Sequence, residues 1–275
     1  MNSLRKALPR SLVPLMVLIR AYLTRLRPAR WSDAQEQMRF VVGEDQPDAV
    51  IKRLAMAYIR RMIWRGESRW HPELVNNQQV AGVEHLRALR DTGTGFIVTF
   101  GHHGDYEGLG PSLARLGIPS HVMATSEMFA EEMPVWMRQQ RAVVTSHEGI
   151  TLLDVAGGSA AIQKVLARGE VVCMATDVVG STPIRFLGHD VRLASGGARI
   201  AIASNVPIVM VTAHRNPTAP EKCATLEVSA PLLPEEFATP TDLLEVMVRH
   251  HELAILAWPE AAEYPRRRFA GTTAH

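Results

Sequence analysis

The stretch Gly95-Phe96-Ile97-Val98-Thr99-Phe100-Gly101-His102-His103-Gly104-Asp105-Tyr106-Glu107-Gly108 decides how the rest of the chain is interpreted. Its first half is a short apolar run rich in β-branched and aromatic residues, which is typical of a buried strand. Residues 171–175 and 206–211 form two more such runs, and stretches of helical spacing lie between them. Strands that alternate with helices indicate a mostly parallel central sheet flanked by helices. The sequence therefore predicts an α/β fold.

The helices expected around this sheet follow from apolar residues at 3.6-residue spacing. Two helices are predicted within residues 32–64, split near Gly43 and Pro47, and no linker or repeat divides the chain after them. We therefore expect a helical N-terminal region at residues 1–66, with the potential to associate with a membrane, and one continuous α/β core at 67–275. Further helices are predicted at 107–116, 128–140, 156–167, 198–203 and 241–257.

Composition excludes several classes of protein. The chain has 275 residues and a formal net charge of +2, too small to indicate nucleic-acid binding. Only two cysteines occur, which is no disulfide framework and favours a reducing, cytoplasmic compartment. Both are expected to be structural, because a free cysteine is among the most often buried residue types.

The N-terminal run at residues 8–26 is apolar but interrupted by arginines. Its longest stretch without charge, residues 11–19, is too short for a bilayer span, which needs about 20 apolar residues. Pro14 and the nearby charges also argue against a secretory signal. Two interpretations stay open: a helix that lies in the headgroup layer at the inner face of the cell membrane, or a first core helix with arginines on its wet face.

Ionisable side chains gather where the strand at 95–100 gives way to a helix. Loops at the carboxyl ends of strands are where α/β sheets place their sites. His102 could remove a proton from a hydroxyl at neutral pH, and Glu107, five residues on, could orient and polarise the imidazole. The alternative for Glu107 is an acid that interacts with the helix dipole, and for Asp105 a helix cap.

The block from Val98 to Glu107 resembles the GHFGNWE block of the bacterial lipid A late acyltransferases, the lauroyl and myristoyl transferases within the lysophospholipid acyltransferase group. The resemblance puts His102 and Glu107 on the catalytic His-x4-Glu signature, with His103, Gly104 and Asp105 beside them. Residues 157–177, 183–201 and 259–269 are similar to later blocks of the family in order and spacing, although residues 120–125 lack its arginine-bearing segment. The resemblance implies a glycerolipid acyltransferase-like fold over nearly the whole chain.

Other residues are candidates for substrate contacts. His103 and Gly104 are expected at the pocket wall, and Asp105 is a candidate for a substrate contact. Asp177 is a candidate for a contact with the acceptor or with another residue of the site, although turn-forming Asp is common at strand ends. Arg185 and Arg199 are candidates to hold a phosphate of either substrate. The basic run at residues 266–268 is a candidate for contact with lipid headgroups or with the acidic face of a carrier protein.

The resemblance, together with His102 and Glu107, implies an O-acyltransferase. It would move a fatty acyl chain from acyl-CoA or acyl carrier protein to a hydroxyl of a lipid or glycolipid, without a bound cofactor or metal. Backbone amides and a nearby arginine would stabilise the oxyanion. Two alternatives stay open. One is a metal-dependent hydrolase that uses His102, His103, Asp105 and a later ligand such as Asp177. The other is an inactive member that binds acyl chains or membranes.

Overall fold

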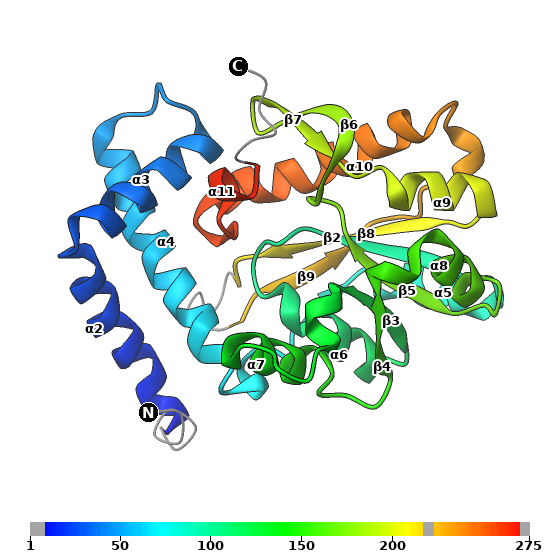
Figure 1. The fold of residues 1–275 in the computed structure, drawn as a ribbon, viewed down its shortest axis with the longest axis horizontal. Coiled ribbons are helices and arrows are strands. Elements are labelled where there is room, and N and C mark those ends of the chain that lie inside the picture. Colours follow the sequence, from blue (N-terminus) through cyan, green and yellow to red (C-terminus); the bar gives the residue numbers. More distant parts are fainter. Residues whose placement is uncertain (1–8, 217–222, 270–275) are drawn as a thin grey trace.

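A computed structural model describes residues 9–216 and 223–269 of the chain. Residues 1–8 of the predicted N-terminal region, which include the first residue of its apolar run, lie outside the described residues. So do residues 217–222 and 270–275 of the predicted core. The described part confirms the predicted α/β class, because its centre is a seven-stranded sheet covered by helices (Figure 1). The strands of this sheet are β1 (Val80–Ala81), β2 (Phe96–Phe100), β3 (Ser120–Ala124), β4 (Ile150–Asp154), β5 (Val171–Ala175), β8 (Ile208–His214) and β9 (Thr225–Val228).

The sheet is mostly parallel, in the order β1-β9-β8-β2-β5-β3-β4. Strand β2 pairs in parallel with β5 on one side and β8 on the other, whereas β9 runs antiparallel to β8. Phe100, the last residue of β2, is in register with Ala175, the last residue of β5, so these two strands end together, while β8 continues past Val211 to His214. A separate antiparallel hairpin is formed by β6 (Val179–Phe186) and β7 (His189–Leu193).

Helices cover both faces of the sheet, and each face has its own apolar cluster. Alternate residues of one strand enter different clusters, as Val172 and Cys173 of β5 do, because successive strand side chains point to opposite faces. Helices α5 (Val83–Asp91), α6 (Leu109–Arg115) and α7 (Val135–Val144) lie over one face. Helices α8 (Gly158–Leu166), α9 (Gly196–Ser204) and α10 (Pro240–Ala257) lie over the other.

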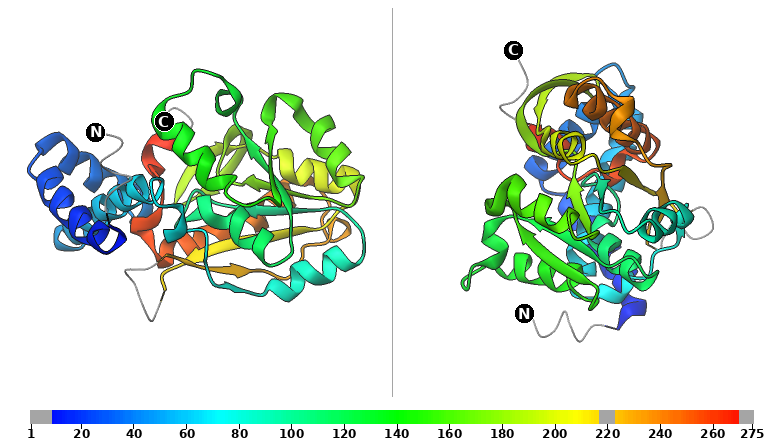
Figure 2. Two further views of the ribbon diagram at one scale, coloured as in Figure 1. Left: turned by 90° about the horizontal axis from the view of Figure 1, so that it is seen from below. Right: turned by 90° about the vertical axis from the view of Figure 1, so that its right-hand side faces the viewer.

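The N-terminal helices form a layer beside the sheet rather than over one of its faces (Figure 2). They are α2 (Val13–Arg25), α3 (Pro28–Val42) and α4 (Asp48–Ser68). The predicted split near Gly43 and Pro47 is confirmed: Gly43, with φ +93°, ends α3, and Pro47 precedes α4. Helix α4 packs on α2 and α3 and reaches the C-terminal 3₁₀ turn Pro259–Ala261. Its far end thereby borders the carboxyl edge of the sheet.

Several predicted boundaries differ from the structure, among them the strand expected at 206–211, which is β8 (Ile208–His214). The helix expected at 128–140 is divided into a 3₁₀ turn, Ser126–Phe129, and α7, which begins after Pro134 because proline is favoured at a helix start and disfavoured inside one. The helix expected at 107–116 begins as the 3₁₀ turn Tyr106–Gly108 and continues as α6. Among the described helices, none has both the length and the apolar content to pass through a bilayer.

Candidate active site

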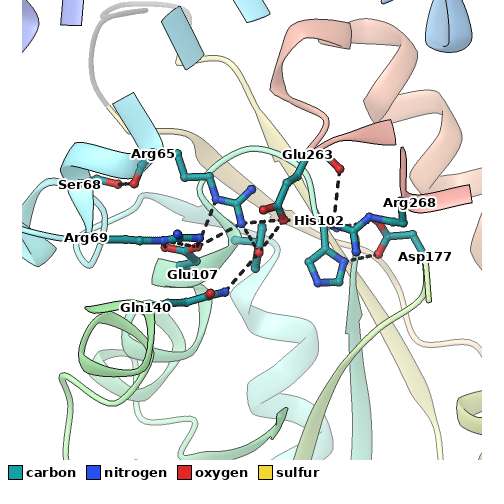
Figure 3. A network of polar contacts seen from close by, with 10 residues as sticks. Arg65, Ser68, Arg69, His102, Glu107, Gln140, Asp177, Glu263 and Arg268 are labelled. Atoms are coloured by element: carbon teal, nitrogen blue, oxygen red, sulfur yellow. Dashed lines mark hydrogen bonds and ion pairs between the residues drawn. The ribbon is translucent and has the colours of Figure 1, made fainter. Parts of the chain in front are cut away.

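The side chains of His102 and Asp177 meet at the carboxyl edge of the sheet, just beyond β2 and β5 (Figure 3). The register pairs Phe100 with Ala175, so the residues two positions beyond each strand come side by side. His102 Nδ1 lies 2.7 Å from Asp177 Oδ1, and the backbone N–H of His102 donates to Asp177 Oδ2 at 3.0 Å. Asp177 therefore positions both the ring and the backbone of His102.

The contact with Asp177 determines where the His102 ring carries its proton. An ionised carboxylate only accepts hydrogen bonds, so Nδ1–H donates to Asp177 and Nε2 keeps its lone pair. The side chain of His102 is 20 % exposed and lines a large cavity. An oriented imidazole with a lone pair and access to a cavity is what a general base requires.

Asp177 stays ionised beside this ring. Its burial opposes the negative charge, but the contacts with His102, which include hydrogen bonds from its ring and its backbone N–H, and the positive charge of Arg268 outweigh that effect and hold the pKa of Asp177 well below its usual range. Arg268 Nε lies 3.6 Å from Asp177 Oδ2, and Arg268 Nη2 donates to Glu263 Oε2 at 3.1 Å. The backbone N–H of Glu263 donates to the His102 carbonyl at 2.9 Å. The C-terminal segment thus holds the His102–Asp177 pair in place.

Glu107 lies in a different part of the network, which corrects the prediction that it orients His102. The carboxylate bonded to the ring is that of Asp177, whereas Glu107 lies between two arginines in Figure 3. Arg65 Nε and Nη2 donate to Glu107 Oε1 at 3.2 and 3.1 Å, and Arg69 Nη2 donates to the same oxygen at 2.7 Å. Glu107 is only 3 % exposed, and a buried carboxylate needs such partners. Its contacts therefore tie the loop after β2 to α4.

Three arginines of α4 and its C-cap face the site, and the sequence analysis did not single them out. Arg61, Arg65 and Arg69 are spaced four residues apart, which places them on one face of a helix. Arg61 Nη2 lies 2.6 Å from Asp105 Oδ1, and Arg65 Nη2 lies 2.7 Å from Glu263 Oε2. Their four-residue spacing was the signal that could have found them in the sequence. Arginines at this spacing lie on one helix face and can pair with acids that pack against that face.

Glu263 is a second residue that the sequence analysis missed. Its burial opposes the charge, but Arg65, His102 and Arg268 together lower the pKa of Glu263 to about 2. Tyr106 donates its hydroxyl to Glu263 Oε2 at 2.9 Å. Arg65 also donates to the hydroxyl of Tyr106. Glu263 is therefore the acid that joins α4, the loop after β2 and the C-terminal segment.

His103 is turned away from the cavity that His102 lines, so its predicted substrate contact is corrected. It is 4 % exposed, and its Nε2 lies 2.9 Å from the backbone carbonyl of Trp258, to which a neutral ring donates. Burial lowers the pKa of His103 to about 4. His103 follows His102 directly, and the two rings therefore diverge. Its role is to dock the loop on the C-terminal segment.

Gly104 and Asp105 also have structural roles in place of the predicted substrate contacts. Gly104 has φ +65°, and a Cβ there would stand 2.4 Å from that of Ala213. Asp105 is 4 % exposed, contacts Arg61, and accepts a hydrogen bond from the backbone N–H of Ala224 at 2.7 Å. Neither residue lines the large cavity. The residues that follow His102, at positions 103–105, are buried and fix the loop after β2, and His102 is thereby held at the cavity.

The arginines predicted to hold a phosphate differ in position. Arg199 of α9 lines the cavity at its exposed side. Arg185 lies on the separate hairpin, where its Nη1 donates to Asp190 Oδ1 at 3.0 Å, and it does not line the cavity. Because β6 belongs to the hairpin and not to the sheet, Arg185 lies apart from the cavity lining, and its contact with a phosphate stays a prediction. The basic run at 266–268 is likewise engaged with the protein's own acids: Arg266 with Glu36 at 2.6 Å, Arg267 with Asp33 at 2.8 Å, and Arg268 with Asp177 and Glu263.

The cavity beside His102 is a large, mainly apolar groove. Its volume of about 940 Å³ is near the upper end of small-molecule pockets, roughly 300–1,000 Å³. Apolar side chains from β3, β5 and helices α6 to α9 supply most of its wall. His102, Glu107, Arg199, Glu263 and Arg268 supply polar groups. Such a groove suits a long apolar chain that carries a polar, reactive end.

The four groups proposed as metal ligands do not gather at one point, because only His102 and Asp177 are in contact with each other. His102 binds Asp177, His103 binds the Trp258 carbonyl, and Asp105 binds Arg61. Within residues 9–216 and 223–269 there is no group of three or more His, Cys, Asp or Glu side chains arranged to hold a metal ion. The arrangement instead combines an oriented imidazole with an apolar groove.

A comparison with protein families agrees with this geometry. The family described as bacterial lipid A biosynthesis acyltransferase matches residues 4–269. The chain belongs to this family. Membership makes it an acyltransferase of lipid biosynthesis and confirms the resemblance found in the sequence. The match covers the N-terminal helices as well as the sheet, so the similarity to the family extends over both parts of the chain.

Comparisons with individual proteins add the following findings. A solved structure similar to this lipid A acyltransferase-type chain is that of the 1-acyl-sn-glycerophosphate (LPA) acyltransferase PlsC from Thermotoga maritima. The two are 13 % identical, with a TM-score of 0.44, over 93 % of this chain and 96 % of that chain. No curated protein matches the sequence.

Proposed function

We propose that this chain transfers a fatty acyl chain from an acyl thioester to a hydroxyl of a lipid or glycolipid, with His102 as the general base. The observation that carries this proposal is the His102–Asp177 pair at the edge of a large apolar groove. Family membership supplies the reaction class, acyl transfer in lipid biosynthesis. Acyl-CoA or acyl carrier protein supplies the chain as a co-substrate, and no bound cofactor is required.

The reaction follows from the groups around His102. Nε2 accepts the proton of the acceptor hydroxyl while its oxygen attacks the thioester carbonyl, and the tetrahedral intermediate then expels a thiolate. The protonated ring returns the proton to that thiolate, so an ester and a thiol are formed. Ionised Asp177 stabilises the positive charge on the ring between these steps. Arg268, which lines the groove and contacts Asp177, is the arginine best placed to stabilise the oxyanion, together with backbone amides.

A direct transfer fits this chain better than a covalent acyl-enzyme. The sequence has no Gly-x-Ser-x-Gly elbow. Cys173 lines the groove, but it is fully buried, and burial raises its thiol pKa to about 11. A thiol that stays protonated at neutral pH is a poor nucleophile. The hydroxyl activated by His102 is therefore the attacking group.

We further propose that the protein works at the surface of a membrane, on the cytoplasmic side, where acyl thioesters are available. Helix α2 buries only its Val13, Val17 and Ala21 face, against α4. Its other side carries large apolar residues exposed to solvent, an arrangement typical of helices that lie in the interface of a bilayer. The residues of this apolar stripe are Leu15, Leu18, Ile19, Tyr22, Leu23 and Leu26.

The test is mass spectrometry of lipids and glycolipids after incubation with a panel of acyl-CoA and acyl carrier protein thioesters. The native protein is expected to form new esters and to consume thioester in equal amount. His102→Ala should reduce product formation by about 10²–10⁴-fold while leaving the thermal unfolding temperature near the native value. Unchanged turnover in that variant would remove His102 as the base. A native protein that binds thioesters but consumes none with any acceptor would be a binding module instead.

A further inference from the structure

The two oxygens of the Glu263 carboxylate are used unequally. Oε2 accepts hydrogen bonds from the hydroxyl of Tyr106 at 2.9 Å and from Arg268 Nη2 at 3.1 Å, and Arg65 Nη2 lies 2.7 Å from it. Within the described part of the chain, Oε1 accepts no hydrogen bond. Each oxygen of an ionised carboxylate has lone pairs for more than one hydrogen bond. Oε1 therefore keeps its full capacity to accept a donor from a bound molecule.

This oxygen belongs to the wall of the groove. Glu263 lines the groove beside Tyr106 and Arg268, and its side chain is 15 % exposed. Three protein groups that can donate surround Oε2, so Oε1 is the oxygen left for a molecule in the groove. With a pKa of about 2, Glu263 is ionised at neutral pH. A largely buried negative charge is stabilised by each further donor that reaches it.

Glu263 also lies close to His102, the proposed base. Its backbone N–H donates to the His102 carbonyl at 2.9 Å. The ring of Tyr106, whose hydroxyl bonds to Glu263, is edge-on to the ring of His102, with 4.8 Å between their centroids. Arg268 spans the carboxylates of Glu263 and Asp177, and the latter is bonded to the imidazole (Figure 3). An acceptor whose hydroxyl is held at Nε2 therefore brings its neighbouring atoms toward Glu263.

We propose that Glu263 is a specificity-determining residue, whose Oε1 accepts a hydrogen bond from a second hydroxyl of the acceptor. This inference rests on the proposed acyl transfer. It adds the chemical class of the acceptor, a lipid whose reactive hydroxyl has another hydroxyl on the adjacent carbon. A lipid with an ether oxygen at that place is selected against, because an ether oxygen and a carboxylate can both only accept hydrogen bonds. The second hydroxyl thus orients the first toward His102 Nε2.

Glu107 is the matched comparison, because it is an acid of the same network that also lines the groove. Its Oε1 accepts from Arg65 and Arg69, and its Oε2 accepts from Arg69 Nε at 3.2 Å. Both oxygens are therefore already engaged by the protein. Loss of its charge disturbs the network without removing a free acceptor from the groove.

The experiment measures kcat/KM for three lipids with one acyl thioester. The lipids are 1-monoacylglycerol, which has two adjacent hydroxyls, and its two mono-O-methyl ethers, each of which keeps one of those hydroxyls. The readout is the ratio of kcat/KM for the diol to kcat/KM for the better ether. Because the ratio compares two substrates of one protein sample, the folded fraction of a variant cancels from it.

The native protein is expected to favour the diol by about tenfold or more, as for a hydrogen bond to a charged group. Glu263→Gln should lose most of this preference. Arg65 and Arg268 can only donate, so they hold the amide oxygen, and the amide NH2 takes the place of Oε1 and donates to a hydroxyl and an ether alike. Glu263→Asp keeps the charge but draws it back from the groove, so its ratio should also fall. Glu107→Gln should keep the native ratio.

The inference is overturned if the native protein shows no preference for the diol, if both Glu263 variants keep the preference, or if Glu107→Gln loses as much of it as Glu263→Gln. A merely structural role of Glu263 would lower kcat/KM for all three lipids and leave the ratio unchanged.

A binding measurement separates this inference from the proposed function. Without a thioester the lipids cannot react, so their dissociation constants do not depend on turnover. The native protein should bind the diol more tightly than either ether by a similar factor, and Glu263→Gln should not. A native protein that forms no ester but shows this Glu263-dependent binding refutes the proposed function and leaves the inference standing. Ester formation at equal rates from the diol and the ethers refutes the inference alone.

Discussion

At the scale of single residues, the site depends on Asp177, the acid that holds the ring of His102. The sequence analysis gave this role to Glu107, and it gave Asp105 and Asp177 only as candidates for other contacts of the site. The structure brings Asp177 to the ring because β2 and β5 are neighbours in register. That both residues follow strands was visible in the sequence. Which strands are neighbours was not, because strand order depends on the whole sheet.

Glu107 is therefore expected to matter first for stability. Glu107→Gln removes the charge that faces Arg65 and Arg69 in a buried site, and breaking a buried ion pair costs about 3–5 kcal/mol. Urea unfolding should show a loss of this order. Glu148→Gln is the control, since Glu148 is exposed, and it should stay within about 0.5 kcal/mol of native. Equal free energies of unfolding for the two variants would mean that the ion pairs of Glu107 with Arg65 and Arg69 do not stabilise the fold.

At the scale of elements, how well the sequence predicted each strand depended on how fully that strand is buried. Strands β2 and β5 are continuous apolar runs at the centre of the sheet and were predicted within a residue. Strands β3 and β4 were missed, since polar residues such as His121, Thr151 and Asp154 interrupt their apolar pattern at the side of the sheet. Helix α4 was predicted from its apolar face. The role of its arginines could not be predicted, because their acid partners lie in the loop after β2, far away in the sequence.

The exposed stripe of α2 leads to a prediction about membrane binding. Ile19 and Leu23 are 52 % and 56 % exposed and four residues apart, so they lie on one face of the helix. Replacing both with Glu should weaken co-sedimentation with vesicles of anionic phospholipid by about tenfold or more. Leu253→Glu changes a residue of α10 that is 54 % exposed, and it is the control. If the control loses as much binding as the double variant, or neither loses any, α2 is not the membrane contact.

At the scale of the whole molecule, the site is assembled from four distant segments. Helix α4, the loop after β2, the residue after β5 and the C-terminal segment converge on one polar network (Figure 3). The sequence marked the second and third of these because they follow strands, and it marked the C-terminal segment by a resemblance to a family block and by the basic run at 266–268. It could not mark Arg65 or Glu263 as partners, since 198 positions separate them and only the packed fold brings them together. The network therefore couples the fold of the N-terminal helices to the site.

This packing predicts how stability depends on pH. Burial lowers the pKa of His103 from 6.5 to about 4, so His103 is neutral in the folded protein and protonates more readily when unfolded. Its contribution to stability is complete above pH 6.5 and is lost as pH falls from there to about 4, a change on the order of 3 kcal/mol. Urea unfolding across this range should show that the free energy of unfolding of His103→Gln, which can still donate to the Trp258 carbonyl, changes less with pH than that of the native protein. If the two free energies change equally with pH, His103 is not a buried neutral residue.

The account as a whole depends on Asp177 rather than Glu107 acting on the catalytic imidazole. The most direct test compares kcat for Asp177→Asn and Glu107→Gln, each normalised to the folded fraction, in one acyl-transfer assay. We expect Asp177→Asn to lose about 10²–10⁴-fold in kcat with little change in KM, because the ring loses its orienting carboxylate, and Glu107→Gln to lose far less. A nearly active Asp177→Asn beside an inactive Glu107→Gln would contradict the account.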